Sequence, residues 1–297
     1  MTRERGAELL LALATVFWSI SYYFSRVCLA ELDALTLNAF RFLCAFVVLG
    51  VVYRRHLRVL TRETLRWGAA VGLLLVVTYV GATYGVQYTS LSNAGFISCL
   101  AVIITPLIEL AAFRKAPERK LVPALLLCVA GLALMTLGDG LRFAAGDALC
   151  LLCSVAYAAD IVVTGRAVAR PAVDPIGMSV VEIGVTGVVF LLLSWAFGSP
   201  CLPQTPAVLG AALFLGVFCS GVAFVIQTTQ QRYTDAARVA LIFTLEPVFS
   251  MAFACVLAGE RPTARGWMGA AMMLLSLLLL QLPFGEEGRR DDVREGV

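Results

Sequence analysis

Long apolar stretches, separated by short polar or Gly- and Pro-containing breaks, follow one another along the whole chain. A helix of roughly 20 mainly apolar residues crosses a hydrocarbon core about 30 Å thick. The pattern therefore predicts an all-α integral membrane protein with ten transmembrane helices. Their expected ranges are 7–29, 34–53, 67–88, 93–113, 121–138, 146–165, 175–197, 206–230, 235–257 and 264–284.

Composition supports this reading. Of the 297 residues 60% are apolar and 14% charged, and the mean hydropathy is +0.87. Soluble domains are nearer ~45–50% apolar and ~25% charged, so a water-soluble globule is excluded. The apolar run from Ala7 to Ala30 is too long for a signal peptide, so we expect it to stay as the first helix. A charged tail, residues 285–297, is expected to be cytoplasmic.

The basic residues indicate an orientation. With a cytoplasmic N-terminus, 17 of the 23 Lys and Arg residues fall on the inner side and 3 on the outer side. This bias agrees with the positive-inside rule and places both termini in the cytoplasm. A net charge of +3, spread over short loops, argues against a nucleic-acid partner.

The two halves of the chain resemble each other. Arg41 and Glu182 stand 141 positions apart, as do Pro106 and Pro247. We therefore expect a duplication, with one five-helix repeat in residues 1–140 and a second in residues 141–284. An odd number of helices makes the second repeat enter from the opposite side, which gives an inverted pair suited to alternating access around a site near the midplane.

Short motifs in both halves resemble the EamA-type repeat of the drug/metabolite transporter superfamily. They comprise Trp18 with Arg26, Ala39–Phe42, Tyr88–Ser90 and Pro106 in the first half, and Tyr233–Ala236, Leu245–Pro247, Gly259–Pro262 and Gly266–Gly269 in the second. The first half departs from the pattern at Phe113–Arg119 and carries four extra residues near Ser90–Asn93. The resemblance implies ten helices, a central cavity lined by helices 1–4 and 6–9, and export of small metabolites such as amino acids from a bacterial cell across its inner membrane.

Charged residues inside the spans are the first candidates for a site, because each needs a partner or a water-filled cavity. Arg41 and Glu182, at equivalent repeat positions, either form an ion pair that acts as a gate or clamp, or are satisfied separately. Asp160 either binds an amine or exchanges a proton in the cavity, or makes an interhelical hydrogen bond. Proton coupling is therefore an open alternative.

Glu246 is followed by Pro247, which leaves the carbonyl of Phe243 without its helical partner and creates a polar break facing the expected cavity. The other reading is that Pro247 and Pro106 only kink their helices. Asp235 and Arg238 share a face with Glu246, and we interpret them as a structural ion pair.

Aromatic and amide side chains complete the expected cavity wall. Tyr79 and Gln87 recur on one side of the third span, and Ser220 and Gln227 on one side of the eighth. Such surfaces suit a small amphipathic solute, although they also serve packing. The full candidate set is Trp18, Tyr22, Arg41, Tyr79, Gln87, Tyr157, Asp160, Glu182, Gln227 and Glu246.

Other motifs give weaker indications of function. Cys150 and Cys153 form a C-x-x-C on a membrane helix without a nearby histidine, so no metal or cofactor is expected. Gly81 and Gly85 favour close helix packing over a dimer face. Without a phosphate-binding loop or a nucleophile with a base, an ATP-driven pump and an enzyme are disfavoured. Uptake of a metabolite and a non-transporting membrane scaffold are the alternative functions; the oligomeric state is left open.

Overall fold

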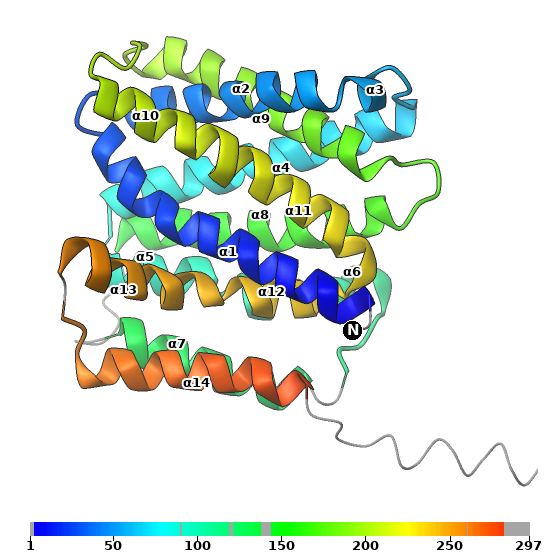
Figure 1. Ribbon diagram of the computed structural model, residues 1–297. Coiled ribbons are helices and arrows are strands. Elements are labelled where there is room, and N and C mark those ends of the chain that lie inside the picture. The colour runs from blue at the N-terminus through cyan, green and yellow to red at the C-terminus, as the bar shows by residue number, and fades with distance from the viewer. Residues whose placement is uncertain (1–2, 90, 119–120, 138–143, 260, 282–297) are drawn as a thin grey trace, which may run out of the picture.

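The computed structural model describes residues 3–89, 91–118, 121–137, 144–259 and 261–281, and every regular element in these ranges is helical (Figure 1). One π-helix, η1, and one 3-10 helix, η2, interrupt the α-helices. The elements are α1 (Arg3–Cys28), α2 (Ala34–Val52), α3 (Arg54–Leu57), α4 (Arg62–Gln87), α5 (Leu91–Cys99), α6 (Ala101–Phe113), α7 (Leu121–Thr136), α8 (Ala145–Val168), α9 (Pro175–Phe197), α10 (Pro206–Phe214), η1 (Leu215–Val222), α11 (Ala223–Gln230), η2 (Gln231–Tyr233), α12 (Ala236–Phe243), α13 (Leu245–Ala258) and α14 (Ala264–Gln281).

Eight helical segments of the described chain are long and apolar enough to cross a membrane. They match eight of the ten expected spans. The fifth and tenth correspond to shorter apolar helices, Leu121–Thr136 and Ala264–Leu279. The expected tail 285–297 lies outside the described residues, as do Arg119 and Glu260. The all-helical membrane class is thus supported, whereas a count of ten spans stays a prediction.

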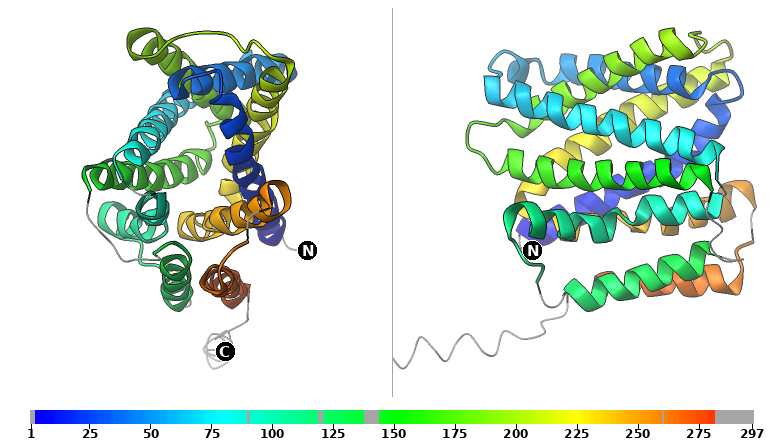
Figure 2. Two further views of the ribbon diagram at one scale, coloured as in Figure 1. Left: turned by 90° about the vertical axis from the view of Figure 1, so that its left-hand side faces the viewer. Right: turned by 180° about the vertical axis from the view of Figure 1, so that it is seen from behind.

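The helices form two opposing walls, seen end-on in Figure 2 (left). One wall contains α4, α8, α5–α6 and α7, and the other contains α1, α10–α11, α12–α13 and α14. Contacts of α2 with α9 join the walls at one end, and contacts of α7 with α14 join them at the other. The largest buried apolar cluster includes Phe42, Ile161, Ile183 and Phe190, and ties α2, α8 and α9 together.

Glycines allow the closest helix contacts. A Cβ atom on Gly81 of α4 would lie 2.9 Å from the carbonyl oxygen of Leu149 in α8, and one on Gly131 of α7 would lie 2.7 Å from that of Gly269 in α14. Any larger side chain would push these helices apart. The interpretation of Gly81 and Gly85 as packing residues is therefore confirmed within this chain.

Two spans are broken near their middle. The helix that ends at Cys99 resumes at Ala101, and the helix that ends at Phe243 resumes at Leu245. Thr244 has ψ −6°, and its amide bonds the carbonyl of Leu241, three residues earlier, instead of continuing the α-helical ladder. Pro247 explains the second break, because it supplies no amide hydrogen to the carbonyl of Phe243.

Candidate functional site

Glu246 lies in the first turn of α13, directly after the break in its span. Its Oε1 accepts a 2.7 Å hydrogen bond from the hydroxyl of Tyr22 in α1. Ser19, one turn earlier in α1, donates to the backbone carbonyl of Glu246 at 2.9 Å. The carboxylate is thus held by α1, and the α-helical N-terminus of α13 favours its negative charge.

The surroundings of Glu246 come from several helices. Arg41 of α2 lies near enough for its charge to act on Glu246, and Glu246 acts in turn on Tyr79 of α4 and Tyr157 of α8. Tyr22 is 61% exposed although it points toward these groups. Groups from both walls therefore lie around an exposed phenol. We call Tyr22 and Glu246 with these neighbours the central site.

Arg41 is buried and is held by η1. Its Nε donates to Ser220 Oγ at 2.8 Å, and its guanidinium lies 5.5 Å from the ring centre of Tyr79. Nη2 is buried without a hydrogen-bond partner among the described residues. No ion pair joins Arg41 to Glu182 in the part of the chain that the structure describes, and each makes its hydrogen bond to a different residue, Ser220 for Arg41 and Thr228 for Glu182.

Trp18 forms the rigid side of the central site. Its indole Nε1 donates to the carbonyl of Cys219 at 3.1 Å, and its ring contacts Phe224 at 5.4 Å and Phe243 at 4.9 Å. Tyr157 stacks on the same Phe243 ring, with 6.1 Å between ring centres. An aromatic wall therefore links α1, α8 and α12.

Asp160, Glu182 and Gln227 lie in a buried layer between α8, α9 and α11. Gln227 Nε2 donates to Asp160 Oδ2 at 3.2 Å, and Thr228 Oγ1 donates to Glu182 Oε2 at 3.3 Å. All four side chains are buried. The interhelical hydrogen bond that we considered for Asp160 is present.

The structure separates some residues that sequence reasoning grouped. Gln87 is exposed at the end of α4 and has no hydrogen-bond partner among the described residues. Ser220 and Gln227 do not share a face, because Ser220 meets Arg41 of α2 whereas Gln227 meets Asp160 of α8. Ser220 lies within the π-helix η1, whose wider turn changes its angle to residues beyond it, so seven-residue spacing no longer places the two side chains on one side.

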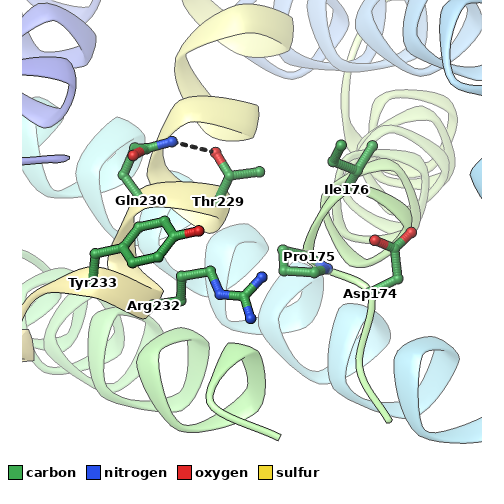
Figure 3. Close-up of a pocket in the computed structure, with 7 residues that line it drawn as sticks. All are labelled: Asp174, Pro175, Ile176, Thr229, Gln230, Arg232 and Tyr233. Carbon is green, nitrogen blue, oxygen red and sulfur yellow. Dashed lines mark hydrogen bonds between the residues drawn. The ribbon is translucent and has the colours of Figure 1, made fainter. Parts of the chain in front are cut away.

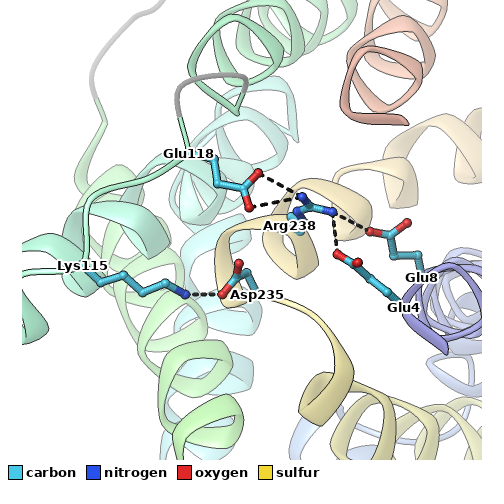
Figure 4. Close-up of polar contacts among 6 residues, drawn as sticks. All are labelled: Glu4, Glu8, Lys115, Glu118, Asp235 and Arg238. Atoms are coloured by element: carbon cyan, nitrogen blue, oxygen red, sulfur yellow. Dashed lines mark hydrogen bonds and ion pairs between the residues drawn. The ribbon is translucent and has the colours of Figure 1, made fainter. Parts of the chain in front are cut away.

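The predicted ion pair between Asp235 and Arg238 is wrong. Arg238 Nη1 lies 2.7 Å from Glu4 and 3.4 Å from Glu8, and Nη2 lies 2.9 Å from Glu118 (Figure 4). These acids come from the start of α1 and from the loop after α6, which helical spacing within one span cannot reveal.

Asp235 pairs instead with Lys115 (Figure 4). Lys115 also lies 3.5 Å from the buried carboxylate of Glu109. Burial works against the charge of Lys115, but the hydrogen bond and charge of Asp235 and the charge of Glu109 outweigh it, so the pKa of Lys115 is raised. The two groups of ion pairs together tie α1, α12 and the loop after α6 at one end of the protein.

A surface cleft of about 230 Å³ lies beside this end, between α9 and α11–η2 (Figure 3). Asp174, Arg232 and Tyr233 line it. Asp174 caps α9 by accepting from Gly177 and bonds His56 at 2.7 Å. None of the candidate residues lines this cleft, which lies away from the Tyr22–Glu246 contact.

Several partners could not be found in the sequence. Ser19, the carbonyl of Cys219 and Thr228 each complete a contact of a candidate residue. Gly216 gives a local indication of the contact of Arg41 with Ser220, because a Cβ atom at position 216 would lie 2.8 Å from Cys44 of α2. This glycine lets η1 approach α2 closely enough for Ser220 to meet Arg41.

Long apolar helices, two broken spans and charged side chains buried between them are typical of multi-pass membrane transport proteins. The chain matches the EamA-like transporter family over residues 5–137 and again over 144–282. It therefore belongs to that family, and with it to the drug/metabolite transporter superfamily. This membership points to a transporter and not to an enzyme.

Relatives agree with this assignment. An uncharacterized transporter of Archaeoglobus fulgidus is 25% identical over 280 residues, which cover 93% of this chain and 86% of that protein. A second uncharacterized transporter of that organism is 26% identical over 263 residues, 86% of this chain and 90% of the other. A crystal structure with 18% identity and a TM-score of 0.80 covers 93% of this chain and 96% of that one, and supports the fold alone.

Proposed function

We propose that this protein is a secondary transporter that exports small organic metabolites, amino acids or related amphipathic solutes, by alternating access with proton coupling. The observation that carries the proposal is the contact of Tyr22 with Glu246, an acid at a broken helix beside an exposed phenol. In many transporters, the substrate is bound where a membrane helix is broken, because polar backbone groups and helix ends are available there.

The charges of the central site suit a zwitterion. Glu246 would receive an ammonium group, and the unpartnered Nη2 of Arg41 would offer a donor to a carboxylate. Tyr79, Tyr157 and Trp18 would contact the apolar part of the solute. This arrangement supports amino acids over purely anionic or purely cationic solutes.

Contacts between helices support the proposed ten spans and the inverted repeats 1–140 and 141–284. Under exchange of the repeats, α2 with α9 and α7 with α14 are contacts of equivalent helices. The remaining main contacts occur in matching pairs, since α4 with α8 corresponds to α1 with α10–α11, and α6 with α8 corresponds to α1 with α13. Two such halves can rock about the central site.

The location belongs to the same proposal. A multi-pass protein with this charge bias would lie in a bacterial inner membrane with both termini cytoplasmic. The ion pairs of Arg238 at the N-terminal end of α1 would then lie on the cytoplasmic side. They would close that side in the state that the structure represents (Figure 4).

The test is flux of a labelled amino-acid panel in proteoliposomes, with and without an imposed pH gradient. We expect saturable flux of one class of amino acid, faster with the gradient. Glu246→Gln should reduce this flux strongly, whereas Asp235→Asn, a matched change outside the central site, should reduce it less. Equal activity of the two variants would remove Glu246 from the site. Net inward flux under the same gradient would favour an uptake permease. The absence of flux with every metabolite class would favour a membrane scaffold that does not transport.

A further inference from the structure

Two buried acids lie in the layer between α8, α9 and α11. Asp160 is 0% and Glu182 1% exposed, and their charges lie near enough to interact. Tyr157, one turn before Asp160, is the other titratable group within reach of its charge. In the described residues of the elements packed on α8 and α9, no Lys, Arg or His forms an ion pair with either acid. Arg41 of α2 is held by Ser220 instead.

The contact between Asp160 and Gln227 contains one hydrogen bond and leaves one oxygen of each side chain without a partner in the described structure. Gln227 Nε2 donates to Asp160 Oδ2 at 3.2 Å, whereas Asp160 Oδ1 and Gln227 Oε1 are both buried without a partner in the described structure. A carboxylate and an amide oxygen are both acceptors and cannot bond each other. Exchanging the amide nitrogen and oxygen would place an acceptor against Oδ2, so it does not remove the mismatch.

One proton on Asp160 Oδ1 resolves both vacant bonds. A carboxylic acid is a donor and an acceptor at once, so the O–H group would bond Gln227 Oε1 while Oδ2 keeps its bond from Nε2. The same proton removes one of two like charges that no cation compensates at this depth. Hydrogen bonding and electrostatics thus favour the same protonation state.

We propose that Asp160 carries an exchangeable proton on Oδ1, held by the carboxamide of Gln227, and that this proton site is separate from the central site. Loading forms the Oδ1–H bond with a proton taken from water on one side, and release breaks that bond and returns the proton to water on the other side. No group is oxidised or reduced. The inference rests on the proposed transport only for its role in coupling.

Infrared difference spectroscopy on the purified, lipid-reconstituted full chain tests the site without any substrate. The difference between alkaline and neutral samples should contain the C=O stretching band of a carboxylic acid. We expect Asp160→Asn to abolish this band and Glu246→Gln to leave it. The asparagine variant should fold, because its amide can donate to Gln227 Oε1 and accept from Nε2, and its thermal unfolding provides the check.

Gln227→Leu provides a second, independent variant. The band should remain but shift to higher frequency, because the carboxyl group loses its amide partner. A band that survives in Asp160→Asn, or one abolished by Glu182→Gln alone, would overturn the assignment. So would a sodium-dependent rise in thermal stability that Asp160→Asn abolishes while no carboxylic acid band is present. An intact band in a protein without flux would reject the transport proposal and leave the proton site standing.

Discussion

Replacing Trp18 with Phe isolates one hydrogen bond of the interior. The change removes the indole N–H that the carbonyl of Cys219 accepts at 3.1 Å, and it keeps an aromatic ring against Phe224 and Phe243. Trp18 is 6% exposed, so water cannot easily replace the lost donor.

The structure sets the size of the expected effect. Leaving a buried acceptor without its donor costs about 1–3 kcal/mol, and we take the lower part of this range, about 1–2 kcal/mol, because a carbonyl has a second lone pair. A loss of ~1 kcal/mol lowers the melting temperature by roughly 2–4 °C in a chain somewhat smaller than this one. We therefore expect a decrease of about 2–8 °C.

A thiol-reactive fluorophore suits this measurement, because Cys28, Cys128, Cys150, Cys153 and Cys219 are buried and free. Their labelling on heating would report unfolding of the detergent-solubilised protein. Trp195→Phe is the matched control, since Trp195 is 70% exposed on α9. An equal decrease in both variants, or none in Trp18→Phe, would refute the assigned hydrogen bond.

Two further predictions concern the ends of the helices. Burial works against ionised Asp33, but bonds from the Thr36 side chain and from the amides of Thr36, Ser199 and Leu35 outweigh it and lower its pKa. Its stabilisation is therefore complete above the unfolded pKa of about 3.9 and is lost as the pH falls through the lower, folded value. Asp33→Ala should therefore cost about 0.5–2 kcal/mol at neutral pH and progressively less as the pH falls below about 3.9, as melting curves can test. Arg238→Gln removes the shared partner of three acids. In a variant whose other cysteines have been replaced, maleimide should then label Cys99 faster from the side on which the N-terminus lies. Arg232→Gln at the same end is the control, and equal labelling rates in the two variants would contradict the prediction.

Much of the fold follows from the sequence because hydrophobic length decides which segments cross a membrane. Eight expected spans correspond to helices of sufficient length. The polar break near Glu246 was also predictable, since Pro247 disrupts the helix whatever surrounds it. These inferences rely on local covalent chemistry and on the bilayer, and neither depends on tertiary contacts.

The pairing of charges could not be predicted in the same way. Asp235 and Arg238 were paired by spacing, yet Lys115 and Glu8 come from elsewhere in the chain. Partners that are distant in sequence compete with neighbours on the same helix, and only the packed structure decides between them. The expected common face of Ser220 and Gln227 failed for another reason, because the local sequence does not predict a π-helix.

That π-helix gives the span from Pro206 to Tyr233 room for a change in length that an α-helix would not have. In an α-helix, removing one residue turns everything beyond it by about 100°. In η1 the backbone could return to α-helical pitch at the same time, and the larger turn per residue would offset most of the lost residue. Gln227 and Thr228 would then stay closer to Asp160 and Glu182 after a single-residue deletion within Leu215–Val222 than after one in the α-helical part of the same span.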